Sequence, residues 1–168
     1  MKNLFVIMIA LATSVSAFCQ KKDVVDIAIG SADHSTLVSA IKAADLVTTL
    51  KGAGPFTVFA PTNAAFNKLP AGTVESLLKP ENKAQLSKIL TYHVVSGNLD
   101  AAAVIAAFKK EKGNVTLTTV SGGKLTASMD NGKVKIIDES VNSAYVTTTD
   151  LKGSNGVIHV IDGVMLPN

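Results

Sequence analysis

The sequence contains no arginine, and this absence narrows the class of partner. All 16 basic residues are lysines, set against 13 acidic residues for a formal net charge of +3. The planar guanidinium of arginine is the preferred group for bidentate contacts to phosphate and for reading guanine in DNA. The densest basic cluster, Lys109-Lys110-Glu111-Lys112, is short and contains a glutamate. We therefore predict that nucleic acid is not a partner.

Cysteine and aromatic residues are also scarce. The chain has one cysteine, Cys19, and 5% aromatic residues, with no tryptophan. A disulfide within the chain is therefore excluded, and aliphatic side chains must fill the core. A single domain of about 150 residues buries roughly 68–70% of the surface of its unfolded chain, which is enough for a core without cross-links.

Several catalytic and cofactor motifs are absent. The sequence has no Gly-x-Ser-x-Gly elbow, no phosphate-binding loop and no cysteine–histidine spacing typical of zinc sites. Its three histidines, His34, His93 and His159, are far apart in the chain. The adjacent carboxylates Asp138 and Glu139 are expected to point to opposite faces of a strand. We predict no cofactor, no metal site and no catalytic residue.

The N-terminus has the organisation of a secretory signal peptide. A positive start at Lys2 is followed by an apolar run over residues 4–15 and then by small residues. This run is too short to cross a bilayer as a stable helix, and no later apolar segment approaches that length. We predict a signal peptide at residues 1–19 and one exported domain at residues 20–168, secreted or held in the periplasm and cell envelope.

Two other ways of processing this end compete with cleavage after Cys19. Cleavage after Ala17 would retain the cysteine, whereas cleavage after Cys19 leaves Gln20 first. In a lipoprotein, Cys19 would carry the lipid anchor. That processing needs a small residue just before the cysteine, and Phe18 stands there instead. We therefore favour an unanchored protein that begins at Gln20.

Hydrophobic periodicity predicts helices in the first part of the mature chain and strands in the second. A long helix is expected from a cap at residues 34–36 to Gly52, and residues 92–95 are expected to be extended. Asp100 is expected to cap the helix of residues 101–112, and residues 130–132 are expected to form a short hairpin loop between two strands. This order is typical of an α+β fold, or of a β-sandwich with helices on one side. The other expected helices cover residues 23–29, 64–69, 73–78, 81–91 and 101–112; the expected strands cover 56–60, 115–120, 125–129, 134–137, 144–149 and 157–161.

Three stretches resemble the signature boxes of the fasciclin domain. They are residues 54–66 (GPFTVFAPTNAAF), residues 90–95 (LTYHVV) and residues 155–167 (NGVIHVIDGVMLP). Their order and spacing also fit, and the resemblance spans residues 23–167. The chain is similar to single-domain secreted fasciclin-like or beta-Ig-H3-like proteins of bacteria.

This resemblance implies both a fold and a function. The fold is a wedge of about seven strands, in a β-sandwich or roll, with several helices along one edge. Members of the family are extracellular and are linked to adhesion and matrix assembly. Animal matrix members carry several copies in tandem, whereas this chain carries one, which argues against cross-linking of partners by one molecule. We expect a monomer.

Residues of the first and third boxes are predicted to support the structure. Phe56 and Phe59 are expected on opposite faces of the first strand, and Pro61 is expected to end it. The Thr62 side chain can accept hydrogen bonds from the unpaired amides at the start of the next helix. Asn155, His159 and Asp162 belong to the last box, where both faces of the strand are apolar and an interior position in the sheet is expected.

Tyr92 and His93 are the candidate binding residues. The resemblance implies a role in receptor binding, because the tyrosine–histidine pair of some animal relatives has that role. From the residues alone, a half-buried histidine that bonds a neighbouring backbone or carboxylate group is the simpler interpretation. We favour the structural role for this pair.

The sequence leads us to expect a non-enzymatic binding module for adhesion or for envelope and matrix interactions, with a cell-surface or matrix protein or glycan as partner. One alternative is a carrier of a small molecule or glycan, in a groove between helices and sheet with an apolar lining. The other is a hydrolase that uses His93 or His159, which needs a hydroxyl or carboxylate beside the histidine in a cleft.

Overall fold

The computed structural model describes residues 22–111 and 113–167, so the predicted signal peptide, Cys19 and the cleavage sites lie outside the described residues. The α-helices are α1 (Val24–Ile29), α2 (Ser35–Ala43), α3 (Val47–Leu50), α4 (Asn63–Asn67), α5 (Thr73–Leu77), α6 (Lys83–Tyr92) and α7 (Ala101–Lys110). The 3₁₀ turns are η1 (Ala32–His34) and η2 (Pro80–Asn82). The strands are β1 (Phe56–Pro61), β2 (Val94–Ser96), β3 (Asn114–Thr118), β4 (Lys124–Asp130), β5 (Lys133–Ile137), β6 (Ser143–Lys152) and β7 (Gly156–Ile161).

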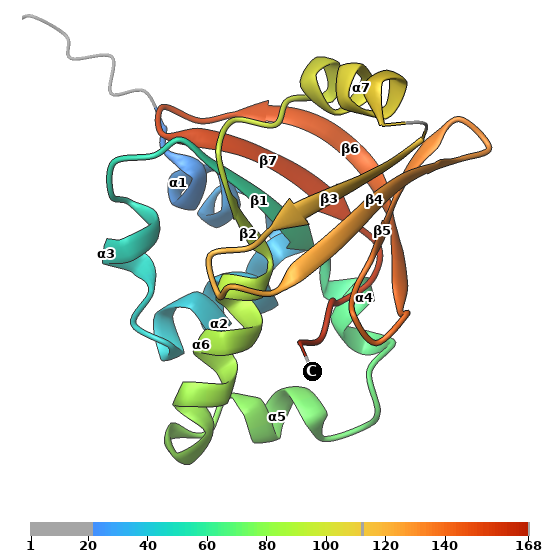
Figure 1. Ribbon diagram of the computed structural model, residues 1–168. Coiled ribbons are helices and arrows are strands. Elements are labelled where there is room, and N and C mark those ends of the chain that lie inside the picture. The colour runs from blue at the N-terminus through green and yellow to red at the C-terminus, as the bar shows by residue number, and fades with distance from the viewer. Residues whose placement is uncertain (1–21, 112, 168) are drawn as a thin grey trace, which may run out of the picture.

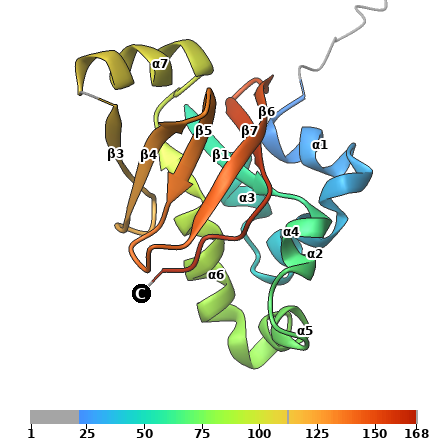
Figure 2. The same ribbon diagram turned by 90° about the vertical axis from the view of Figure 1, so that its right-hand side faces the viewer.

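The seven strands form one mixed sheet in the order β2-β1-β7-β6-β5-β4-β3. Strand β1 pairs with β7 in parallel, and all other neighbours are antiparallel. A single bridge between Val95 and Thr119 joins the two edges, so the sheet curls into a nearly closed barrel (Figure 1, Figure 2). The predicted α+β wedge of seven strands with helices is confirmed, and β7 is interior as expected. The parallel pairing is a feature that the run of predicted antiparallel strands did not indicate.

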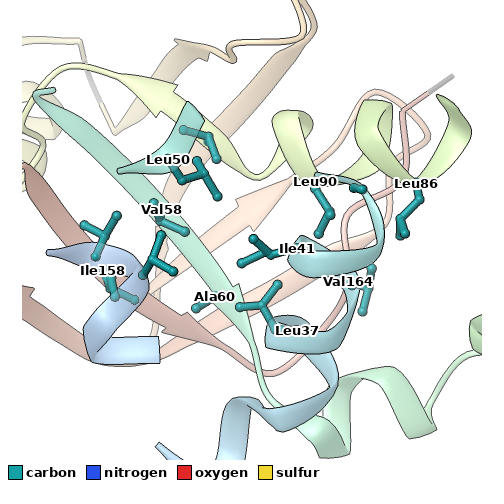
Figure 3. Close-up of a cluster of buried hydrophobic side chains, with 14 of the residues drawn as sticks. Leu37, Ile41, Leu50, Val58, Ala60, Leu86, Leu90, Ile158 and Val164 are labelled. Atoms are coloured by element: carbon teal, nitrogen blue, oxygen red, sulfur yellow. The ribbon is translucent and has the colours of Figure 1, made fainter. Parts of the chain in front are cut away.

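The helices occupy two separate positions. Helices α1 to α6 lie together on one side and at one end of the sheet, whereas α7 lies alone at the opposite end (Figure 1, Figure 2). Beneath the larger group, aliphatic side chains of α2 and α6 meet those of β1 and β7. Figure 3 shows this cluster, which includes Leu37, Ile41, Leu86, Leu90, Val58 and Ile158.

A second cluster fills the interior of the barrel and is covered by α7. It is more aromatic than the first, because Phe59, Tyr92 and Phe108 all belong to it. Its aliphatic members include Leu117, Leu125, Ile136, Val146 and Ile161. The fold therefore has two cores, one on each face of β1 and β7, which explains why both faces of these strands are apolar.

Local chemistry accounts for several element boundaries. The Asp100 carboxylate accepts a hydrogen bond from the amide of Ala103 and caps α7, as predicted. Asn131 and Gly132 both have positive φ, at 49° and 79°. This geometry is typical of the two-residue turn that joins β4 to β5 and agrees with the predicted hairpin.

Two of the predicted elements are wrong. The helix expected from residues 34–36 to Gly52 is broken into α2 and α3, because Asp45 between them adopts a left-handed conformation with φ of 56°. Residues 92 and 93 are not extended: Tyr92 ends α6 and His93 still has helical backbone angles, so the extended chain begins at Val94. The first turn of α2 is capped from a distance by Asn63, whose side chain accepts from the Thr36 amide.

Candidate functional site

The tyrosine–histidine pair lies inside the molecule. Helix α6 is followed directly by β2 (Figure 1). The side chains of Tyr92 and His93 bond to the start of β4, the turn after β5 and the C-terminal segment. Their exposed fractions are 0% and 3%. The expectation of half-buried side chains is therefore wrong, because both are enclosed by elements that come later in the chain. Neither side chain offers surface to a docking partner in this structure.

Both ring nitrogens of His93 are bonded to the backbone. Nδ1 lies 2.8 Å from the carbonyl oxygen of Ile89, and Nε2 lies 3.0 Å from the amide nitrogen of Met165. A carbonyl accepts and an amide donates, so Nδ1 carries the proton and the imidazole is neutral. Burial lowers the pKa of His93 to about 4, which favours the same neutral form. The imidazole thereby links α6 to the segment that follows β7.

The Tyr92 hydroxyl links α6 to two turns of the barrel. It donates to the carbonyl of Lys124 at 2.8 Å and accepts from the amide of Glu139 at 3.2 Å. Burial raises the pKa of the phenol above its usual value. A Cβ atom at Gly123 would lie 2.4 Å from the ring, so a side chain at that position would displace the tyrosine.

Asp138 completes this polar network, and sequence reasoning missed its role. The carboxylate is buried and accepts from the backbone and side-chain amides of Asn142, at 2.8 and 3.0 Å, and from the amide of Leu166 at 3.1 Å. Asp138 and Glu139 follow β5 in a turn rather than lying on a strand. The available signal for such local bonding was Asp138 with Asn142 four positions later, because both residue types often bond to nearby backbone groups in turns.

The third signature box fastens distant segments together. The Asn155 side-chain amide donates to the carbonyls of Leu50 and Gly52, at 2.7 and 3.1 Å, and its oxygen accepts from the amide of Val24 at 3.1 Å. The Asp162 carboxylate accepts from the amide of Tyr145 at 2.8 Å. These contacts join α1, the end of α3 with the residues just after it, and β6 to the two ends of β7.

His159 is buried on β7 and is also bonded through both ring nitrogens. Nε2 lies 2.6 Å from the carbonyl oxygen of Leu99, and Nδ1 accepts from the amide of Asp150 at 3.4 Å. Its ring lies 5.8 Å from that of Phe59, centroid to centroid. Like His93, it holds backbone segments in place.

The first signature box forms strand β1 and the cap of helix α4. Phe56 begins β1, and its amide donates to the carbonyl of Asn155 at 3.0 Å. Pro61 is buried at the end of β1, and the Thr62 hydroxyl accepts from the amide of Ala65 at 3.2 Å to cap α4. Thr57, which sequence reasoning passed over, is fully buried and bonds both Gly97 and Leu99 across the β2–α7 connection.

The spaces beside the buried histidines His34 and His159 are too small for the substrate of a hydrolase or the ligand of a carrier. A hydroxyl, that of Ser31, lies 2.9 Å from Nδ1 of His34, but the cavity beside this pair has a volume of only about 10 Å³. The apolar space between α7 and the sheet, beside Phe59 and His159, is also about 10 Å³. Neither space admits more than about one water molecule. No cluster of three metal-ligating side chains occurs within residues 22–111 and 113–167.

A wider hollow lies on the surface at the opposite end of β7 from the C-terminal segment. Its volume is about 470 Å³. Three connections form it: the loop before β1, the link between β2 and α7, and the turn between β6 and β7. The residues that line it include Pro55, Asn98, Lys152, Ser154, Asn155 and Val157. None of these was singled out from the sequence as a ligand-binding residue.

The fold and its signature contacts define a single α+β domain of the fasciclin class. Residues 32–167 match the family described as the Fasciclin domain, and the protein belongs to this family. The solved structure of a FAS1 domain pair from the insect cell adhesion molecule Fasciclin I has the same fold. It superposes with a TM-score of 0.75 at 22% identity, over 86% of this chain and 51% of that chain.

The sequence is also similar to individual proteins of bacteria and animals. It is 56% identical over 144 residues to Protein sll1483 of Synechocystis, covering 86% of this chain and 73% of that protein. It is 38% identical to transforming growth factor-beta-induced protein ig-h3 of Sus scrofa, over 86% of this chain but 19% of that protein. It is 38% identical to the cell surface glycolipoprotein MPB83 of Mycobacterium bovis, over 79% and 55% of the two chains. The cyanobacterial and mycobacterial relatives support a bacterial source. Among the described helices, none has the length and apolar character needed to cross a membrane.

Proposed function

We propose that this protein is an exported, non-enzymatic binding module that attaches the cell or its envelope to a protein or glycan of the surroundings. The observation that carries the proposal is that the ring nitrogens of His93 and His159 are occupied by hydrogen bonds within the fold. All four of their ring nitrogens are bonded to backbone groups, at 2.6 to 3.4 Å. A general base needs a free nitrogen within reach of a substrate proton, so the residues named for hydrolysis instead hold the fold.

Membership of the fasciclin family supports the same proposal. One relative is named a cell surface glycolipoprotein, and the structural neighbour is part of a cell adhesion molecule. The predicted signal peptide at residues 1–19 agrees with an exported protein. The carrier alternative is not favoured, because the apolar space between α7 and the sheet has a volume of only about 10 Å³.

Attachment of source cells to a protein-coated surface tests this function. We expect more attached cells than on a surface coated with an unrelated lysine-rich exported protein, and we expect soluble protein to compete. Attachment equal to that on the control surface would contradict the proposal. Turnover of chromogenic ester or glycoside substrates that persists in the double variant His93→Gln, His159→Gln would also contradict it, because an active site would then lie elsewhere.

A further inference from the structure

We propose that the 470 Å³ hollow, which is formed by the loop before β1, the β2–α7 link and the β6–β7 turn, binds a carboxylate-bearing sugar. Lys152 is the cation that recognises the carboxylate. This inference rests on the proposed function, for which it names the class of ligand and the site. The volume lies within the range of about 300–1,000 Å³ that is typical of small-molecule sites. It suits a sugar ring better than a bare anion.

The walls of the hollow are fixed before any ligand arrives. The amide of Gly97 donates to the carbonyl of Pro55 at 2.9 Å, and the amide of Ser154 donates to the carbonyl of Lys22 at 2.9 Å. The Asn155 side chain adds three bonds, to the Val24 amide and to the carbonyls of Leu50 and Gly52. A binding site that is already ordered loses less conformational entropy when the ligand binds, and this favours affinity.

The glycines around the hollow are explained by backbone packing. A Cβ atom at Gly54 would lie 1.9 Å from the carbonyl oxygen of Asn155, and one at Gly156 would lie 2.1 Å from that of Phe56. These two residues therefore allow strands and loops to approach each other closely. Ligand recognition is therefore assigned to the polar side chains that line the hollow and not to its glycines.

Three polar side chains of the lining take no part in holding the walls. Asn98, Lys152 and Ser154 are exposed, and their side chains make no hydrogen bond or ion pair with any residue in the described part of the chain. The lining includes no aspartate or glutamate. An ammonium group, an amide and a hydroxyl thus share one preformed hollow with no carboxylate to neutralise the charge.

This set of groups matches an acidic sugar. The lysine ammonium is a compact, flexible cation with three donors for a carboxylate. The Asn98 amide offers two donors and an acceptor, and the Ser154 hydroxyl offers both, which suits sugar hydroxyls. Pro55 adds exposed apolar surface for the face of the ring. An extended peptide would instead need a strand edge and pockets for alternate side chains.

Titration calorimetry with an oligogalacturonate, and with the matching neutral galactose oligomer, tests the proposal on the purified protein. We expect heat of binding from the acidic oligomer and none from the neutral one. Lys152→Gln should weaken binding about fivefold, the effect of one partly exposed ion pair. Lys109→Gln, the same charge change on α7, should weaken it by less than about twofold. Asn98→Ala should weaken binding while leaving thermal unfolding unchanged.

Four results would overturn the assignment: absence of binding by the acidic oligomer, equal affinity for both oligomers, equal losses in Lys152→Gln and Lys109→Gln, or displacement of the oligomer by an equal concentration of inorganic phosphate. The cell-attachment assay separates this inference from the proposed function. If cells attach but the acidic oligomer does not bind, this site is wrong and the function stands. If the oligomer binds but cells do not attach, the site stands and the adhesive function is wrong.

Discussion

Two buried histidines, one just before α2 and one at the end of α6, have very different surroundings. His93 is 3% exposed and has backbone partners for both ring nitrogens. His34 is 5% exposed and has the Ser31 hydroxyl at Nδ1, but its Nε2 has no partner among the described residues. Burial lowers the pKa of both rings. The comparison shows that burial of a histidine is not itself stabilising, because a buried polar atom without a bond costs free energy.

Replacement of His93 is expected to have the largest effect. His93→Leu fills the space but leaves the Ile89 carbonyl and the Met165 amide buried without a partner, so it should lower the free energy of unfolding by roughly 3–4 kcal/mol. A urea titration measures this. Lys109→Ala on exposed α7 serves as the control and should change stability by less than about 0.5 kcal/mol. A loss for His93→Leu no larger than the control would show that its hydrogen bonds do not hold the fold.

Lowering the pH should reduce the stability of the fold through His93. The pKa of His93 is about 4 in the folded protein against an ordinary value of 6.5, so the unfolded chain binds more protons as the pH falls. The neutral ring therefore stabilises the fold above pH 6.5, and this stability is lost as the pH falls toward 4. The loss should approach about 3 kcal/mol at roughly 1.4 kcal/mol per pKa unit.

The His93→Leu variant isolates this contribution from the carboxylates that titrate in the same range. The variant should lose clearly less stability than the wild type between pH 7 and pH 4.5, as measured by urea titration at each pH. The remaining loss should include the His34 contribution, because its pKa is also lowered. Parallel pH curves for the two proteins would contradict the assignment of the effect to His93.

A smaller effect is expected at the cap near His34. The Thr62 hydroxyl accepts from the Ala65 amide, so Thr62→Ala should lower stability by about 1 kcal/mol, whereas Thr62→Ser should restore most of it. Equal melting of the wild type and both variants would show that this cap contributes nothing. A loss near 1 kcal/mol would show that this cap stabilises the start of α4.

The smallest effect is expected at His34. His34→Leu loses the contact to Ser31 but also removes a buried nitrogen without a partner, so stability should change by less than about 1 kcal/mol in either direction. The matched pair His34→Leu and His93→Leu, compared at pH 7, therefore tests the contrast directly. Losses of the same size at both positions would show that partner bonds do not distinguish the two sites.

Local signals in the sequence predicted much of this fold. The Thr62 and Asp100 caps and the Asn131–Gly132 turn depend on residues within a few positions of each other. The helix break at Asp45 and the helical conformation of His93 were missed, because tertiary contacts decide them. Propensity and periodicity carry little information about such contacts.

The candidate sites show the same limit. Tyr92 and His93 could be selected from the sequence, but their complete burial depends on Lys124, Glu139 and Met165, which lie far along the chain. The surface hollow could not be predicted at all, because its lining comes from three connections that meet only in the folded sheet.

The parallel pairing of β1 with β7 also fixes the order in which the protein can assemble. Synthesis proceeds from the N-terminus, so β1 must wait for residues 156–161 before its second edge is paired. Until then the growing chain has no path to its stable barrel, and an apolar strand edge stays open to aggregation. Pairing between such distant segments is also slow. Because β7 is the last strand of the described chain, the barrel can close only when nearly all of residues 22–167 are available.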